Sequence, residues 1–520
     1  MKKSFFANTI VLTLTTQLLR ITGLCFIAFL TGKIGPEGIG LFQLISSVYF
    51  LASTFAISGV GVAVSRLTAE SVGTSGNKTI SNIVGRALII SLFIGIFAGL
   101  TFFLLSGFIG TYVLADGRSV LSLKTLSFAL PFMAVTVSLR GYFFGLKKAT
   151  APAAQMIFEQ AVQLIVLFSI IDSFVPLGLE YACFAIAISS VVSEALSFGF
   201  GFVMYAVQKS RSSLTVMRDS SINRKILGIS VPVALSSYLR SGLRTAENVL
   251  IPSGLRRFGA TESEALSQFG LLGMVMPILL FPSSFLTAVS ALLLPEISEA
   301  SALNDNQKVR AIFSKVFKIT TVLSLLFSGI FAAFAGDFGV LIYKNKASGV
   351  LLMLLAPLLP LIYLDYIVDS MLCGLNQQTA TLKINVLDYT LRIGLILFLI
   401  PRYGFAAYIA VFYASTMLNA FLSIRRLLIV SGSRIEYADW VIKPLLCVTI
   451  ACLTTRILIR LTGYIELSAE ALIIKISSAI LLYTVFLFLT RCLGRSDIEW
   501  LAGVARKRKM TRAKYTSNGI

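Results

Sequence analysis

Residues 7–44 read ANTIVLTLTTQLLRITGLCFIAFLTGKIGPEGIGLFQL, which is an apolar run, a glycine-rich turn and the start of a second apolar run. The first run covers residues 5–31 and the second covers residues 41–64. Each is long enough to cross a hydrocarbon core of about 30 Å as an α-helix. The pattern predicts two successive membrane helices, with one arginine, Arg20, inside the first.

The composition of the whole chain agrees with this reading. Of 520 residues, 56% are hydrophobic and 13% are charged, against about 25% charged residues in a globular protein. The mean hydropathy is +0.87, and so few polar side chains cannot cover a soluble core of this size. We therefore expect an integral membrane protein, and a soluble enzyme or a secreted disulfide scaffold is excluded.

Twelve more apolar runs follow the first two. They give an all-α, polytopic fold of about fourteen transmembrane helices. Their approximate limits are 82–113, 121–144, 150–173, 178–206, 228–252, 267–294, 311–342, 348–374, 380–400, 404–430, 440–463 and 468–490.

The distribution of lysine and arginine predicts the orientation. The segments on the side of both termini hold 30 basic residues, Arg140 included, and the opposite loops hold 10. By the positive-inside rule, both termini are cytoplasmic and the protein is a multi-pass cell-membrane protein. The net charge of +21 is therefore explained by membrane orientation and contact with anionic lipids, and it does not indicate binding to nucleic acid. The tail at 506–514, RKRKMTRAK, is read as a basic anchor beside anionic lipid.

An internal repeat organises the chain. At an offset of 229, LRGYFFGLKKATAPAAQMIFEQ (139–160) aligns with VDSMLCGLNQQTATLKINVLDY (368–389), so that Glu159 matches Asp388. Earlier in each half the offset is 220, and Arg20 matches Arg240. Each repeat holds six spans, so the halves have the same orientation, as in many transporters whose substrate path lies between parallel repeats.

The repeat sets the predicted domain limits. We expect an N-lobe at 1–210, a cytoplasmic linker at 211–226 and a C-lobe at 227–432. Two further spans at 433–492 and a basic tail at 493–520 complete the chain.

Three arginines inside the spans are the candidate substrate-binding groups. A charge near the middle of a bilayer is costly and tends to face a bundle interior or a wet cavity. Arg20 and Arg240 occupy matching places, and Arg244 lies one turn after Arg240. Guanidinium groups suit bidentate capture of phosphate oxygens, so we expect an anionic, phosphate-bearing substrate. The alternative is that membrane acids neutralise them, and Glu247 is placed to pair with Arg244.

Intramembrane acids are the candidate ion-coupling groups. Glu159 and Asp388 are repeat mates, and Asn385 lies one turn before Asp388. These oxygens could take a proton or Na⁺. The alternative is simple neutralisation of a nearby arginine, for which Arg392, four residues after Asp388, is the candidate.

Arg66 is a further candidate substrate-binding residue at the cytoplasmic end of its span. The interpretation that we favour is an interfacial charge that helps to close an inward gate, with Glu70, Glu296 and Glu299.

Enzymatic machinery is not evident in the sequence. It has no histidine, no GxxxxGK[ST] loop and no cysteine cluster of metal-ligand spacing. The six cysteines are read as apolar packing residues. We therefore expect no enzyme and no cofactor beyond Na⁺ or H⁺ coupling.

Three motifs carry a resemblance to a known family. They are residues 7–44 quoted above, GVGVAVSRLTAE at 59–70, and GYFFGLKKATAPAAQMIFEQ at 141–160 with its second copy. The sequence resembles the multidrug/oligosaccharidyl-lipid/polysaccharide (MOP) exporter superfamily. Within it, the sequence is most like the stage V sporulation protein B and oligosaccharide flippase branch, which is related to the lipid II flippases.

The resemblance implies two six-helix lobes arranged as a V, and alternating access for a polyprenyl-pyrophosphate-linked sugar. It implies cavity arginines on the first helix; Arg20 matches one, but the position of a second falls on Phe26. It also implies a Na⁺ site on helices 7, 11 and 12, for which Glu247, Asn385, Asp388 and Thr416 are the matching candidates.

The resemblance leaves two functions to be compared. The first is a flippase for a lipid-linked oligosaccharide or a lipid II-like peptidoglycan precursor, acting as a monomer. The alternative is a cation-coupled multidrug exporter of the same superfamily. An exporter of organic cations should expose acids where this chain has Arg20 and Arg240, so the flippase is favoured.

Overall fold

The computed structural model describes residues 2–57, 59–74, 77–210, 222–303, 305–461, 468–492 and 494. Within these ranges the regular elements are helices and no β-strand occurs. A helix satisfies its backbone hydrogen bonds internally, which is what lipid demands of a single spanning segment. The all-α, polytopic fold class is confirmed, whereas the basic tail at 506–514 lies outside the described residues.

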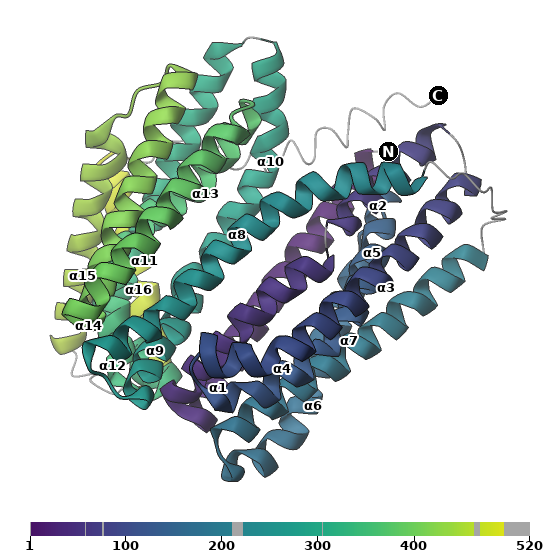
Figure 1. Ribbon diagram of the computed structural model, residues 1–520. Helices are drawn as coiled ribbons and strands as arrows, with labels where there is room; N and C mark the ends of the chain where they lie inside the picture. Colours follow the sequence, from purple (N-terminus) through teal and green to yellow (C-terminus); the bar gives the residue numbers. More distant parts are fainter. Residues whose placement is uncertain are drawn as a thin grey trace. The chain divides into compact units, whose positions relative to one another are not determined.

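Sixteen α-helices follow one another along the described chain (Figure 1). They are α1 (Lys2–Ile57), α2 (Val60–Thr74), α3 (Asn77–Phe108), α4 (Val120–Ser127), α5 (Ala129–Gly145), α6 (Thr150–Phe174), α7 (Leu179–Ser210), α8 (Ile222–Phe258), α9 (Glu262–Leu280), α10 (Ser283–Ala302), α11 (Asn306–Tyr343), α12 (Lys346–Leu355), α13 (Leu359–Gly374), α14 (Gln378–Ser431), α15 (Lys443–Leu461) and α16 (Ala469–Leu489).

These helices account for the fourteen predicted spans. Eleven described segments are long and apolar enough to cross a membrane, and the bent pair 117–127 and 129–145 adds a twelfth. Two of them are far longer than the roughly 20 residues that one crossing needs, at 62 residues (11–72) and 54 residues (378–431). Each contains a glycine with non-helical angles, Gly35 (φ 66°) and Gly404 (φ 66°). Each therefore makes two crossings.

Two spans that the sequence predicted as continuous are interrupted near prolines. The span predicted at 121–144 bends by 45° between α4 and α5, where Pro131 cannot donate to the carbonyl of Ser127. The span predicted at 267–294 is divided between α9 and α10, with Phe281 and Pro282 between them.

Contacts divide the chain into two compact units. Unit 1 comprises residues 1–277 and 389–411, and unit 2 comprises residues 278–388 and 412–520. The predicted division into an N-lobe, a C-lobe and two extra spans stays a prediction. Residues 211–221 of the predicted linker lie outside the described residues, and α8 begins at Ile222.

Unit 1 is held by close helix packing. A buried cluster joins α2, α3, α5, α7 and α8, and the rings of Tyr142 and Tyr205 meet edge-on at 5.3 Å within it. A Cβ on Gly141 would lie 2.3 Å from the carbonyl oxygen of Gly61. Such approach through small residues is the usual way in which membrane helices associate. Figure 1 shows α8 beside α1 in the same unit.

Unit 2 uses buried polar bonds between its helices. The hydroxyl of Tyr363 donates to the carbonyl of Leu279 at 2.6 Å, and that of Tyr483 donates to Val322 at 3.0 Å. Lys475, which lies within the predicted span 468–490, pairs with Asp337 at 2.7 Å. The pair ties α16 to α11.

Candidate functional site

Arg20, Arg240 and Arg244 all belong to unit 1 and all have exposed side chains. Arg20 lies in the first segment of α1, and the other two lie in α8. Among the residues that the structure describes, none of the three has a hydrogen bond or an ion pair; Arg244 lies over the ring of Phe50, 6.0 Å from its centroid. Their charges are thus available to a ligand.

Contacts along α1 and α8 place these arginines at similar positions along the helix axes. The rings of Phe26 and Phe42 lie 6.2 Å apart, whereas 16 residues of straight helix would span about 24 Å. The chain therefore reverses at Gly35, and Arg20 falls opposite about residue 48 of the returning segment.

Hydrogen bonds to the same returning segment of α1 fix how α8 is aligned beside it. Thr245 donates to the carbonyl of Ser47 at 3.0 Å, and the hydroxyl of Thr54 donates to Ser241 at 3.2 Å. Arg244 therefore lies beside about residue 48 of α1. Because Arg20 lies opposite the same residue, Arg20 and Arg244 are at the same position along the helix axes, and Arg240 is about one turn away.

Glu247 is engaged by an arginine other than the predicted one. Its carboxylate accepts from Arg392 at 3.2 Å, and the side chains are only 8% and 14% exposed. Arg244 has no ion pair to a described residue, so the alternative in which Glu247 neutralises Arg244 is wrong. The partner is 145 residues away in sequence, which local spacing could not reveal.

Glu159 forms a partly buried polar cluster in unit 1. Arg140 of α5 pairs with its carboxylate, and the hydroxyl of Ser197 donates to it at 2.8 Å. Gln155 accepts from Arg140 at 3.4 Å and donates to the carbonyl of Ser197 at 2.8 Å. Glu194, 9% exposed, belongs to the same electrostatic neighbourhood.

Arg140 is a residue that the sequence reasoning missed. It was counted with a cytoplasmic segment, but it lies inside α5 with a side chain 17% exposed. The signal that could have found it is its place in the predicted span 121–144.

Asp388, Asn385 and Thr416 lie together in unit 2, on α14. Asp388 is 4% exposed and accepts a hydrogen bond from Ser415, next to the buried Thr416. Asn385 donates to Asp369 of α13 at 3.4 Å. The structure thus gathers carboxylate, amide and hydroxyl oxygens at α13 and α14, while the candidates Glu247 and Glu159 belong to unit 1.

Arg66 forms an exposed pair with Glu70 on α2, at 2.9 Å, with side chains 66% and 56% exposed. A pair of this kind is worth little to stability. Its role in binding or in gating stays a prediction.

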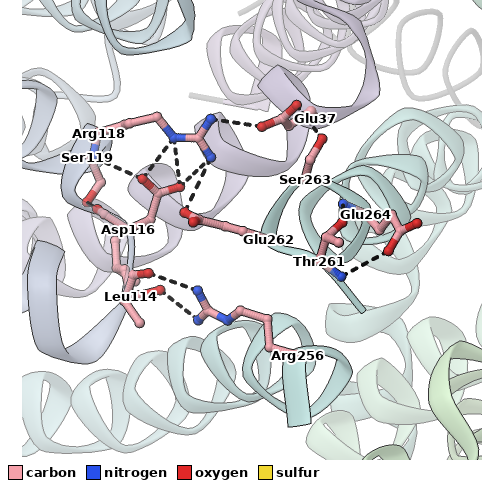
Figure 2. A network of polar contacts seen from close by, with 11 residues as sticks. Glu37, Leu114, Asp116, Arg118, Ser119, Arg256, Thr261, Glu262, Ser263 and Glu264 are labelled. Atoms are coloured by element: carbon pink, nitrogen blue, oxygen red, sulfur yellow. Dashed lines mark hydrogen bonds and ion pairs between the residues drawn. The ribbon is translucent and has the colours of Figure 1, made fainter. Parts of the chain in front are cut away.

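A polar network made of residues that the sequence did not predict as site residues joins the turns of three helix pairs (Figure 2). Arg118 donates to Asp116 at 2.9 Å, to Glu37 at 2.8 Å and to Glu262 at 3.4 Å. Ser263 donates to Glu37 at 2.6 Å. These residues come from the turns after the first, third and seventh predicted spans, which the basic-residue count assigns to the outer side.

A second set of bonds supports this network. Arg256 donates to the carbonyls of Leu114 and Ala115, at 2.9 Å each. Nearby, a Cβ on Gly40 would lie 2.0 Å from the carbonyl oxygen of Leu266, and one on Gly270 would lie 1.9 Å from that of Pro36. The first repeat and the start of the second are thus in backbone contact at this end of unit 1.

Two classes of group are absent from the described residues. No cluster of three or more metal-ligating side chains occurs there, and the six cysteines are unpaired.

Comparison with known sequences finds one matching family model and several curated relatives. The family model described as polysaccharide biosynthesis protein matches residues 5–253. The stage V sporulation protein B of Bacillus subtilis is 25% identical over 407 residues, covering 77% of this chain and 79% of that protein. The lipid II flippase MurJ of Bacillus subtilis is 22% identical over 463 residues, covering 82% and 83%. These matches confirm the predicted resemblance.

Solved structures show the same fold at low identity. A lipid II flippase MurJ in an inward closed conformation matches with a TM-score of 0.67 and 15% identity, over 93% of this chain and 99% of that one. An inward-facing multidrug resistance MATE transporter of the MOP superfamily matches with a TM-score of 0.65 and 15% identity, over 80% and 96%. The fold is therefore shared by flippases and drug transporters, and it does not show which of these two functions this chain has.

Proposed function

We propose, on the premise that the chain is related to the polysaccharide biosynthesis proteins and the lipid II flippases, that it is a flippase. Its cargo is a polyprenyl-(pyro)phosphate-linked oligosaccharide or peptidoglycan precursor, moved across the cytoplasmic membrane by alternating access. The protein carries out transport and no covalent chemistry. It acts as a monomer with both termini in the cytoplasm.

The observation that carries the proposal is the set of unneutralised arginines, Arg20, Arg240 and Arg244. Three permanent charges without a described partner, in a protein of the membrane, are costly unless a ligand or water compensates them. A pyrophosphate offers several oxygens to guanidinium forks, and such charge-assisted bonds are the strong ones. An anionic headgroup therefore fits these residues better than a cationic drug does.

Alternating access needs one face of the protein closed while the other is open. The network around Arg118 and the glycine contacts at Gly40 and Gly270 join the first repeat to the second at one end of unit 1. In the predicted orientation this is the outer face. Loading of the cargo from the cytoplasm requires this face to be closed.

The energy source in this proposal is a cation that acts on Asp388, with Asn385 and Thr416 as neighbouring oxygens. A bound ion shifts the conformational equilibrium only if it binds the two states unequally. Asp388 is favoured over Glu159, because the neutral side chains of Asn385 and Thr416 lie on the same helix as Asp388, whereas the cation Arg140 pairs with Glu159.

The second candidate is a cation-coupled multidrug exporter, favoured by the TM-score of 0.65 to a MATE transporter. An exporter of this kind should tolerate loss of Arg20 and Arg240, because neither would touch an organic cation favourably. That difference separates the two functions.

Complementation of a strain that lacks its lipid-linked sugar flippase tests the proposal. We expect Arg20→Ala and Arg240→Ala to lose complementation at normal membrane abundance, and Arg20→Lys to retain part of it, since lysine keeps the charge but not the fork. Arg402→Ala, which removes an exposed arginine beside the Gly404 turn, is the matched control and should complement. Full complementation by the double alanine variant would reject arginine-based cargo binding.

A further inference from the structure

A hollow of about 470 Å³ lies in unit 2, between the first turns and the last turns of α14. The two ends of this long helix belong to two antiparallel crossings, so their terminal turns lie at one membrane face. The residues that line the hollow include Gln377, Lys383, Ile384, Leu422, Arg425, Arg426 and Ile429.

The lining is cationic and contains no acid. Lys383 and Arg425 are exposed and have no hydrogen bond or ion pair to a described residue. Arg426 donates twice to the amide oxygen of Gln377, at 3.2 Å and 2.5 Å. A neutral amide holds the guanidinium in place without cancelling its charge, so the hollow presents three positive charges.

The walls beside these charges are apolar, and apolar side chains around them are exposed. Ile429 is 64% exposed and Phe421, one residue before Leu422, is 62% exposed. In a membrane protein such surfaces meet acyl chains. The basic-residue count places the loop before α14 and the loop after it on the cytoplasmic side, where the anionic lipids of the leaflet concentrate basic residues.

We propose that this hollow is a binding site for one anionic phospholipid of the cytoplasmic leaflet. Its phosphate lies among Lys383, Arg425 and Arg426, and its acyl chains lie against Ile384, Leu422 and Ile429. A free phosphate uses only the cations, whereas a phospholipid uses both the cations and the apolar wall. The site is separate from Arg20, Arg240 and Arg244, and the inference does not depend on the proposed cargo.

The test uses the full chain, purified and placed in nanodiscs of phosphatidylcholine with increasing phosphatidylglycerol. Binding is read from the lipid that the protein retains in native mass spectrometry and from its thermal unfolding. We expect the wild type to retain one phosphatidylglycerol in preference to phosphatidylcholine, and to unfold at higher temperature as the anionic fraction rises.

The pocket variant carries Lys383→Gln, Arg425→Gln and Arg426→Gln. Each cation near an anionic surface contributes roughly fivefold to binding, so the variant should bind phosphatidylglycerol about 100-fold more weakly. The control carries Lys344→Gln, Lys346→Gln and Arg402→Gln, three exposed cations elsewhere, and should bind like the wild type. Equal loss in both variants would show general charge attraction and overturn the site.

Two further arms use only the wild type, so they do not depend on folding of the variants. Inorganic phosphate at millimolar concentration should not reproduce the stabilisation; if it does, the hollow is an anion site and not a lipid site. A polyprenyl-pyrophosphate sugar should not displace the retained phosphatidylglycerol. Displacement would assign the hollow to the cargo and overturn the proposal, while leaving the flippase function itself untouched.

Discussion

At the scale of single residues, the pair of Arg140 and Glu159 makes a sharp prediction about stability. Their side chains are 17% and 24% exposed, so removal of one member should destabilise the protein, by less than the about 3–5 kcal/mol that a fully buried pair loses when the other charge is left uncompensated. Glu159→Gln should therefore lower the unfolding temperature in detergent. The double change Arg140→Leu with Glu159→Leu should recover most of the loss.

The exposed pair of Arg66 and Glu70 is the matched control for that experiment. Arg66→Gln should change the free energy of unfolding by no more than about 1 kcal/mol. If Glu159→Gln is as stable as the wild type, Glu159 does not serve as the partner of Arg140 and its candidacy as an ion site is reopened.

Asp388 carries the prediction about coupling. Flipping by the wild type in proteoliposomes should accelerate under an imposed Na⁺ or proton gradient, and Asp388→Asn should remove that acceleration while basal flipping remains. Ser415→Ala removes a hydrogen-bond donor to Asp388 but keeps the carboxylate, so it should keep the gradient response. A gradient response that survives Asp388→Asn contradicts the assignment.

At the residue scale, the sequence correctly placed Arg20, Arg240 and Glu247 within long helices, but it missed Arg140 in α5. It also failed to predict how the charges pair. The sequence offered Arg244 as the partner of Glu247, whereas the partner is Arg392. Helical spacing identifies neighbours on one helix, but a contact between distant helices depends on packing that spacing does not encode.

At the scale of elements, the two glycines that divide α1 and α14 have similar backbone angles but differ in the space around them. Gly35 has φ 66° and ψ −178°, and Gly404 has φ 66° and ψ −148°. This region is essentially restricted to glycine, and another residue there costs about 1–3 kcal/mol. A Cβ on Gly35 would meet no atom within 4 Å, whereas one on Gly404 would lie 2.8 Å from the ring of Phe258.

Gly404→Ala should therefore destabilise the protein more than Gly35→Ala in thermal unfolding. Gly394→Ala, at a helical position of α14 with no atom within 4 Å of the new Cβ, should be neutral or stabilising, because alanine favours helix over glycine. If all three variants unfold at the same temperature, the two breaks are not what fixes the turns.

Elements were predictable from the sequence because lipid imposes a length and a composition on each crossing. The fourteen spans followed from apolar runs alone. Local breaks were less accessible: the interruption between α9 and α10 and the bend between α4 and α5 occur at prolines inside runs that remain apolar throughout. Hydropathy does not register a lost backbone donor.

At the scale of the whole molecule, the bias of 30 basic residues against 10 predicts that both termini are cytoplasmic. In a cysteine-free background, Lys3→Cys and Lys514→Cys should react with an impermeant maleimide only after the cells are opened. Lys344→Cys, in a loop predicted to be external, should react in intact cells. Labelling of either terminus from outside would reject this orientation.

The central claim is that Arg20 and Arg240 bind an anionic, lipid-linked sugar that the protein transports. The most direct measurement is transport by the wild type and by the double variant Arg20→Ala with Arg240→Ala, in the same proteoliposomes, of two cargoes. One cargo is a fluorescent polyprenyl-pyrophosphate disaccharide and the other is a fluorescent organic cation. We predict rapid flipping of the first cargo by the wild type, a drop of about tenfold or more in the variant because charge-assisted bonds are lost, and no transport of the cation. Transport of the organic cation by the wild type, unchanged in the variant, together with no flipping of the disaccharide, would contradict the claim.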